Sequence, residues 1–252
     1  MQVNANLGIN LAFPAQNNNT PTFTPHRAGN SGTLIAVILD ESGSMVSCRD
    51  ATITGFNEFV KGQAEASGAG QAYLSLIKFC SPIVSTVYEN HPVTKVEPLT
   101  TRTYTPGGGT NLLDAVGETI TRINTFLGTL PQEQRPGVLI MIMTDGEENA
   151  SRTYNHASIK HMVKTCEHEG DFTFMFLGAN VDAFAMGNTF GMNASNTASY
   201  STASMAATMN VMSESATRVR MAKAAGTTTQ ELYASNTLYS AQERDRMQGD
   251  SK

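Results

Sequence analysis

The sequence predicts an α/β fold, with an open, doubly wound and mostly parallel sheet, helices on both faces and one antiparallel edge strand. Three observations support this prediction. Short, continuous apolar runs have the length of strands buried on both faces, these runs alternate with helical segments, and two of them end in an aspartate, Asp40 and Asp145. Sheets of this kind bind ligands at the carboxyl ends of their strands, so the two aspartates also indicate a candidate site.

The first half of the chain supplies the edge strand and the first central strands. TLIAVILD is almost wholly apolar and rich in β-branched residues, as a central strand requires. Ile53, Phe56 and Val60 recur at spacings of three and four, which predicts one face of a helix. QAYLSLIKFC and IVSTVYE indicate a strand and its hairpin or edge partner. The predicted elements are strand 33–40, helix 46–67, strands 71–80 and 83–89, and a helix whose apolar stripe runs from 112 to 127.

The second half repeats the alternation. GVLIMIMTD is another largely apolar run that ends in an aspartate, and DFTFMFLGAN follows it as a further buried strand. Met205, Met209 and Met212 share a helical stripe with Ala216 and Val219, which we interpret as core packing of a late helix. The predicted elements are strand 137–145, helix 155–169, strand 171–180, short helix 181–190 and helix 204–225.

Composition divides the chain into four parts. The beginning is rich in Asn, Thr, Pro and Gly, which favours a flexible arm over a core element. The end is polar and lacks a long apolar stripe. The expected division is a flexible arm at 1–32, an α/β domain at 33–192, a C-terminal helical extension at 193–225, and a polar tail without ordered structure at 226–252.

Composition also excludes several classes of protein. The chain has 252 residues, 40% of them hydrophobic, and a formal net charge of -5. Nucleic-acid binding is not expected, because it relies on Lys and Arg that contact phosphates. The three cysteines, Cys48, Cys80 and Cys166, are scattered, which is typical of a reducing compartment. With neither a secretory signal nor a run of ~20 apolar residues, we expect a cytoplasmic protein that does not contact a membrane.

Three loops bring oxygen ligands to the predicted carboxyl edge. LDESGSM carries Asp40, Ser42 and Ser44. A triple-glycine loop, which can adopt tight or left-handed conformations, leads to Thr110, and Asp145 ends the next apolar strand. Two carboxylates and three hydroxyls form an all-oxygen set, which hard divalent ions prefer, whereas zinc favours nitrogen and sulfur. The sequence therefore predicts a site for Mg²⁺, with Mn²⁺ or Ca²⁺ as alternatives.

This arrangement resembles the von Willebrand factor A (VWA) domain and its metal-ion-dependent adhesion site (MIDAS). In that family D-x-S-x-S is followed by a distant threonine and a distant aspartate, and all five positions match here in order. The resemblance covers roughly residues 33 to 190. GFNEF, TDGEEN and FLGAN with DAF are similar, more loosely, to small stand-alone A-domain proteins of bacteria and their phages. The resemblance implies a Rossmann-like fold and, for a phage protein, the host cytoplasm.

The resemblance also implies a role for each position. Ser42 and Ser44 would bind the ion directly through their hydroxyls. Thr110 would bind directly in one conformation and through water in another. Asp40 and Asp145 would act mainly through water or through the serine hydroxyls. An Asp or Glu side chain of a partner protein would complete the ion's shell, so the chain would be a non-enzymatic, metal-dependent protein-interaction domain.

Other interpretations of the same residues stay open. Ser42 and Ser44 can cap the following helix. The glycine loop can hold a phosphate at a helix N-terminus, although it lacks the P-loop pattern. A structural assembly component with a degenerate site is a further alternative. The acidic neighbours are expected to be solvated: Glu41, Glu147 and Glu148.

Two kinds of enzyme are also conceivable. An Mg²⁺-dependent phosphatase or hydrolase could use Asp40 as a nucleophile. Such enzymes usually carry a second acid two residues on, where this chain has Ser42. A serine hydrolase is disfavoured, because the G-x-S-x-G pattern is absent around Ser42.

Overall fold

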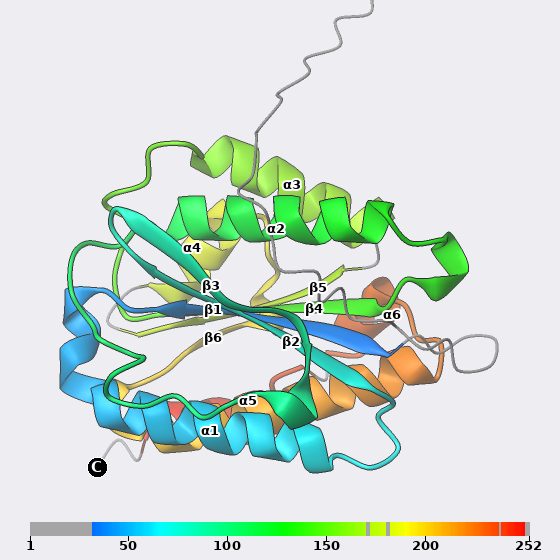
Figure 1. The fold of residues 1–252 in the computed structure, drawn as a ribbon, viewed down its shortest axis with the longest axis horizontal. Helices are drawn as coiled ribbons and strands as arrows, with labels where there is room; N and C mark the ends of the chain where they lie inside the picture. The colour runs from blue at the N-terminus through cyan, green and yellow to red at the C-terminus, as the bar shows by residue number, and fades with distance from the viewer. Residues whose placement is uncertain (1–31, 170–171, 180–181, 237, 250–252) are drawn as a thin grey trace, which may run out of the picture.

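The computed structural model describes residues 32–249 apart from 170–171, 180–181 and 237, so the arm expected at 1–32 lies almost wholly outside the described residues. Six strands form one sheet in the order β3-β2-β1-β4-β5-β6. Neighbouring strands are parallel except β2 and β3, which are antiparallel and place β3 at one edge. The predicted fold class is confirmed (Figure 1).

Most elements begin and end close to where the sequence predicts them. The strands are β1 (Thr33–Asp40), β2 (Ala72–Cys80), β3 (Ile83–Pro92), β4 (Gly137–Thr144), β5 (Phe172–Gly178) and β6 (Thr197–Ser199). The α-helices are α1 (Arg49–Glu65), α2 (Leu112–Gly128), α3 (His156–Glu169), α4 (Ala183–Thr189), α5 (Met205–Ala224), α6 (Thr229–Ala234) and α7 (Ala241–Gln248). A 3-10 helix, η1 (Gly43–Cys48), precedes α1, and another, η5 (Thr202–Ser204), precedes α5.

The sheet has a hydrophobic core on each face. Helices α2 and α3 cover one face, and α1 and α5 cover the other (Figure 1). Along β1, Ile35, Val37 and Leu39 belong to the core beneath α1 and α5, while the residues between them belong to the core beneath α2 and α3. Every residue of β1 is buried, as its continuous apolar sequence predicts for a central parallel strand.

The tail expected to lack ordered structure is helical instead. Residues 226–249 contain α6 and α7, each of which begins with a capping box, at Thr228 with Glu231 and at Ser240 with Glu243. Their few apolar side chains, among them Leu232 and Met247, are buried in the core beneath α1 and α5. Burial of these side chains, together with the caps, stabilises helices that composition alone does not predict.

In the part of the chain that the structure describes, no helix is both long enough and apolar enough to cross a lipid bilayer.

Candidate functional site

The site lies where the order of the strands reverses. From β1 the sheet continues to β2 and β3 on one side and to β4, β5 and β6 on the other. Asp40 is the last residue of β1, and Asp145 directly follows β4, its neighbour. The carboxyl ends of two adjacent parallel strands at such a switch point are the usual ligand site of this kind of sheet. The fold therefore brings together the two aspartates that the sequence predicts.

The serine loop turns its hydroxyls toward Asp145. Ser42 Oγ lies 3.1 Å from Ser44 Oγ. Ser44 Oγ in turn donates a hydrogen bond of 2.5 Å to Asp145 Oδ1. Ser42 and Asp145 are buried, whereas Ser44 is exposed. These three side chains form a row of oxygen atoms that reaches solvent at Ser44.

Asp40 is fully buried behind this row. Its Oδ1 accepts the backbone N–H of Ser42 at 2.7 Å, and its Oδ2 accepts the hydroxyl of Thr144 at 2.6 Å. Burial raises the pKa of Asp40, and the hydrogen bonds from Thr144 and Ser42 offset part of that rise. Burial also raises the pKa of Asp145, against the hydrogen bond from Ser44. A cation would stabilise the charged form of both carboxylates.

Thr110 reaches the site from the glycine loop. The N–H of Gly43 donates to the carbonyl of Gly108 at 3.1 Å, which joins this loop to the serine loop. Gly108 has a φ of +74°, and a Cβ there would lie 2.8 Å from the carbonyl oxygen of Ser81, so only glycine fits. The N–H of Thr110 donates to Asn149 Oδ1 at 2.9 Å, which joins it to the segment after Asp145.

Gly146 lies close to the hydroxyls of two of the three loops. A Cβ at this position would lie 3.2 Å from Thr110 Oγ1 and 3.6 Å from Ser44 Oγ. The two hydroxyls therefore face one point from different loops, and this point lies next to Asp145. Among the described residues, no three His, Cys, Asp or Glu side chains form a cluster that could hold a metal. Any ion at this site would depend on hydroxyl oxygens, which fits a hard cation.

The two simpler interpretations of these loops receive no support from the contacts at Ser42 and in the first turn of α2. Ser42 precedes η1, but its side chain makes no capping hydrogen bond there. A phosphate at the start of α2 would need free backbone N–H groups. The N–H of Leu113 already donates to Glu148 Oε2 at 2.8 Å, and that of Asp114 donates to Ser151 Oγ at 3.0 Å.

The expectation that the acidic neighbours are solvated is wrong for two of the three. Glu147 is exposed. Glu41 is buried and lies 2.7 Å from Lys78 Nζ. Glu148 is half-buried and accepts four donors, among them the N–H and the hydroxyl of Ser151 at 2.7 Å each. Both carboxylates therefore bind neighbouring segments of the chain.

Sequence reasoning missed two residues that shape the site. Thr144 donates to Asp40, and Lys78 pairs with Glu41. The signal for Lys78 is visible in LSLIKFC, because a lysine inside a buried apolar strand needs a buried partner. Thr144 carries no comparable signal, since its role depends on β4 lying beside β1.

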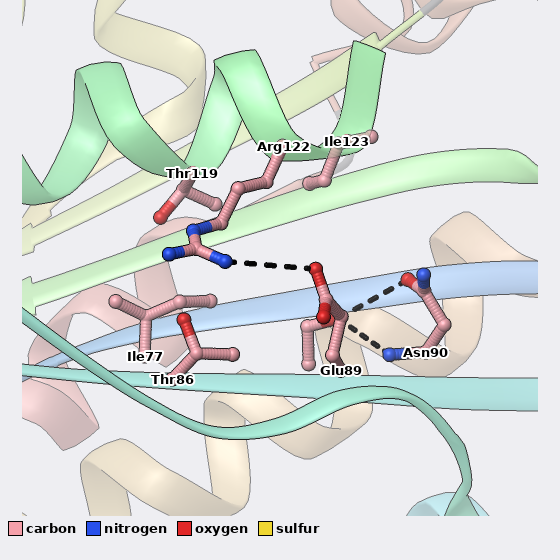
Figure 2. A pocket seen from close by; sticks show the side chains of 8 residues that line it. Ile77, Thr86, Glu89, Asn90, Thr119, Arg122 and Ile123 are labelled. Atoms are coloured by element: carbon pink, nitrogen blue, oxygen red, sulfur yellow. Dashed lines mark hydrogen bonds and ion pairs between the residues drawn. The ribbon is translucent and has the colours of Figure 1, made fainter. Parts of the chain in front are cut away.

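A second hollow lies between α2 and the β2–β3 hairpin, away from this site (Figure 2). Its volume is about 10 Å³, room for about one water molecule. Ser75 Oγ lies 3.3 Å from Asn90 Oδ1 at its wall, and Arg122 reaches across from α2 to within 4.0 Å of Glu89. This hollow is too small for a substrate.

Comparison with known proteins finds structures with a similar fold but no protein with a matching sequence. No protein-family model and no curated protein matches the chain. Two structures of proximal thread matrix protein 1 from the mussel byssus match at 16% identity, with TM-scores of 0.52 and 0.51 over 74% and 73% of this chain. This chain matches 47% of the mussel protein, about half its length. Manganese-loaded TRAP protein of Plasmodium vivax matches at 16% identity and a TM-score of 0.48, over 70% of this chain and 71% of that protein.

The match to the mussel protein concerns the fold alone, because the identity is low. Together with the six-stranded sheet and its antiparallel edge, it supports the Rossmann-like α/β fold of VWA domains.

Proposed function

We propose that this chain is a non-enzymatic interaction domain that binds a divalent cation, Mg²⁺ or alternatively Mn²⁺ or Ca²⁺, and captures an acidic side chain of a partner protein. The observation that carries this proposal is that two hydroxyls from different loops, those of Thr110 and Ser44, approach the same side of Gly146, next to the buried carboxylate of Asp145. The proposed cation site consists of Asp40, Ser42, Ser44, Thr110 and Asp145.

The contacts within the site support a direct role for hydroxyls and an indirect one for carboxylates. Both Asp40 oxygens already accept hydrogen bonds from the protein, and Asp145 Oδ1 accepts one from Ser44. The hydroxyl of Thr110 has no hydrogen-bond partner among the described residues. We therefore assign direct contact to the hydroxyls, with the two aspartates acting through them or through water.

This ligand set favours a carboxylate as the partner group. Three neutral hydroxyls neutralise little of a divalent charge, so the bound ion would attract an anionic oxygen from outside. An Asp or Glu side chain of another protein supplies such an oxygen. The fold is shared with a protein that is by name a matrix protein, which is in keeping with a binding role. A cytoplasmic setting and kinship with bacterial or phage proteins stay predictions from the sequence.

A phosphatase reaction has less support. An aspartyl nucleophile needs a carboxylate oxygen free to attack, whereas both oxygens of Asp40 are engaged by Ser42 and Thr144. Hydrolysis of p-nitrophenyl phosphate that requires both Mg²⁺ and Asp40 would reverse this preference.

Calorimetric titration with Mn²⁺ tests the cation site directly. The wild type should bind the ion, and the double variant Ser42→Ala/Ser44→Ala should lose binding while its circular dichroism spectrum stays unchanged. Ser47→Ala is the matched control, because this exposed serine lies in the same 3-10 helix as Ser44 and, among the described residues, its hydroxyl hydrogen-bonds only to the carbonyl of Ser44. Absence of Mn²⁺ binding by the wild type would reject the proposal.

Capture of a partner tests the second half of the proposal. Immobilised wild-type protein should retain partners from a cell extract in Mg²⁺ and release them in EDTA. The Ser42→Ala/Ser44→Ala variant should retain none of the EDTA-sensitive set identified by mass spectrometry. Equal retention with and without the chelator would contradict a metal-dependent interaction.

A further inference from the structure

A buried ion pair lies directly behind the serine loop. Lys78 Nζ is 2.7 Å from Glu41 Oε1 and 2.8 Å from Oε2, and the two side chains are only 10% and 8% exposed. Glu41 stands in the sequence between Asp40 and Ser42, two residues of the cation site. The same ammonium donates to the carbonyl of Thr103 at 2.6 Å. Lys78 thus has an acceptor for each of its three protons, on two separate segments of the chain.

Glu41 binds the segment that leads to Thr110 at two more points. Its Oε1 accepts the N–H of Thr105 at 2.6 Å, and its carbonyl accepts the N–H of Gly107 at 2.9 Å. Residues 103–110 belong to no helix or strand, so their position depends on such contacts rather than on a regular ladder of hydrogen bonds. Glu41 and Lys78 together hold this segment against the serine loop.

We propose that Glu41 and Lys78 are positioning residues of the cation site, which hold the hydroxyl of Thr110 at the right distance from those of Ser42 and Ser44. The inference rests on the proposed function, because it concerns affinity for the ion. It adds two residues that do not contact the ion. Groups that orient metal ligands in this way affect affinity nearly as strongly as the ligands themselves.

Substitution of Lys78 separates positioning from charge. If the pair mattered only through its charges, Lys78→Met would remove a positive charge near the ion and tighten binding. If the pair positions Thr110, the same variant loses the contacts to Glu41 and Thr103 and binds the ion more weakly. The double variant Glu41→Met/Lys78→Met leaves the net charge unchanged and carries no uncompensated buried charge, so it should fold.

The experiment measures Mn²⁺ affinity by electron paramagnetic resonance of the free ion, with circular dichroism to confirm folding. Lys78→Met and Glu41→Met/Lys78→Met should each weaken binding about tenfold or more. Lys78→Arg, which keeps the cation, should stay close to the wild type.

An ion pair elsewhere, with a buried carboxylate and an exposed lysine, supplies the control. Glu167 Oε2 lies 3.4 Å from Lys164 Nζ in the last turn of α3. Because α3 ends just before β5 begins, this pair lies near the amino ends of the strands, opposite the carboxyl ends where the cation site lies. Glu167→Gln should lower thermal stability without changing Mn²⁺ affinity.

Two results would overturn the inference: Mn²⁺ binding by Lys78→Met as tight as or tighter than the wild type, or wild-type affinity in the double variant. If the single variant fails to fold, the double variant decides. Either result leaves the proposed function intact, whereas a wild type that binds no Mn²⁺ rejects both.

Discussion

Asp40 and Asp145 are the two side chains whose ionisation matters most at this site. Burial raises both pKa values above the value of about 3.9 for an unperturbed aspartate. Between the ordinary and the raised value, the folded chain binds more protons than the unfolded chain. The free energy of unfolding of the metal-free protein therefore falls as the pH rises through this window, and stays lower above it.

We predict that Asp145→Asn weakens this pH dependence and leaves the metal-free protein at least as stable as the wild type at neutral pH. Urea unfolding in EDTA at pH values between about 4 and 7 measures the effect. Mn²⁺ should reverse the order of stability. Binding of the ion raises the free energy of unfolding of the wild type by about 2.7 kcal/mol when the free ion is at about a hundred times its Kd. A variant that is less stable than the wild type in EDTA at neutral pH would contradict the sign.

At the scale of the elements, hydrogen bonds join the start of α2 to the segment that follows Asp145. Asp114, in the first turn of α2, accepts the N–H groups of Arg152 at 2.8 Å and of Thr153 and Tyr154 at 2.9 Å each. In the opposite direction, Glu148 accepts an N–H from the first turn of α2. These contacts in both directions hold the loop that carries Thr110 next to the loop that begins at Asp145.

Asp114→Asn should lower the free energy of unfolding by about 1–3 kcal/mol, because an amide replaces one acceptor oxygen with a donor that faces backbone N–H groups. It should also weaken Mn²⁺ binding, since the two loops are then less tightly joined. Glu118→Gln is the control: this half-buried residue is one turn further along α2 and should leave Mn²⁺ affinity unchanged. Urea unfolding and Mn²⁺ titration of both variants provide the measurement, and equal Mn²⁺ affinity in both would argue against this role of Asp114.

At the scale of the whole molecule, the C-terminal helices are part of the domain core. Tyr233 on α6 donates to Glu167 and accepts the N–H of Phe174 in β5, at 2.9 Å each. From α7, Arg244 donates to the carbonyl of Ala194 at 2.9 Å, and the carbonyl of Met247 accepts the N–H of Ser201 at 2.9 Å. These contacts join α6 and α7 to the far edge of the sheet.

Truncation after Ala225 should therefore destabilise the entire domain rather than trim a tail. The buried side chains that it removes each contribute roughly 1.5–3 kcal/mol, and their sum approaches the total stability of a typical domain. Met247→Ala, at a fully buried position, should by itself cost about 2–5 kcal/mol. Exposed Gln248→Ala should change stability by less than about 0.5 kcal/mol. Cooperative thermal unfolding of the truncated chain near the wild-type midpoint would contradict this view.

The elements that the sequence missed have no long periodic apolar pattern. Strand β6 has only three residues, too few for a periodic pattern. Helices α6 and α7 are polar, but Thr228-x-x-Glu231 and Ser240-x-x-Glu243 are capping-box signatures that predict helix starts. The tail was thus predictable in part from its caps, whereas its burial was not.

The sequence by itself determined the order of the central strands and helices and the mostly parallel sheet, and it predicted five oxygen-bearing residues as a site. These follow from local apolar periodicity and from the rule that parallel strands share a carboxyl edge. Only the tertiary structure decided which of the neighbouring charges face solvent. Glu41 and Lys78 are 37 positions apart, and Asp40 and Thr144 are 104 apart. Such pairs form only when separate strands pack side by side, because a buried charge takes whatever partner the neighbouring strand or loop presents.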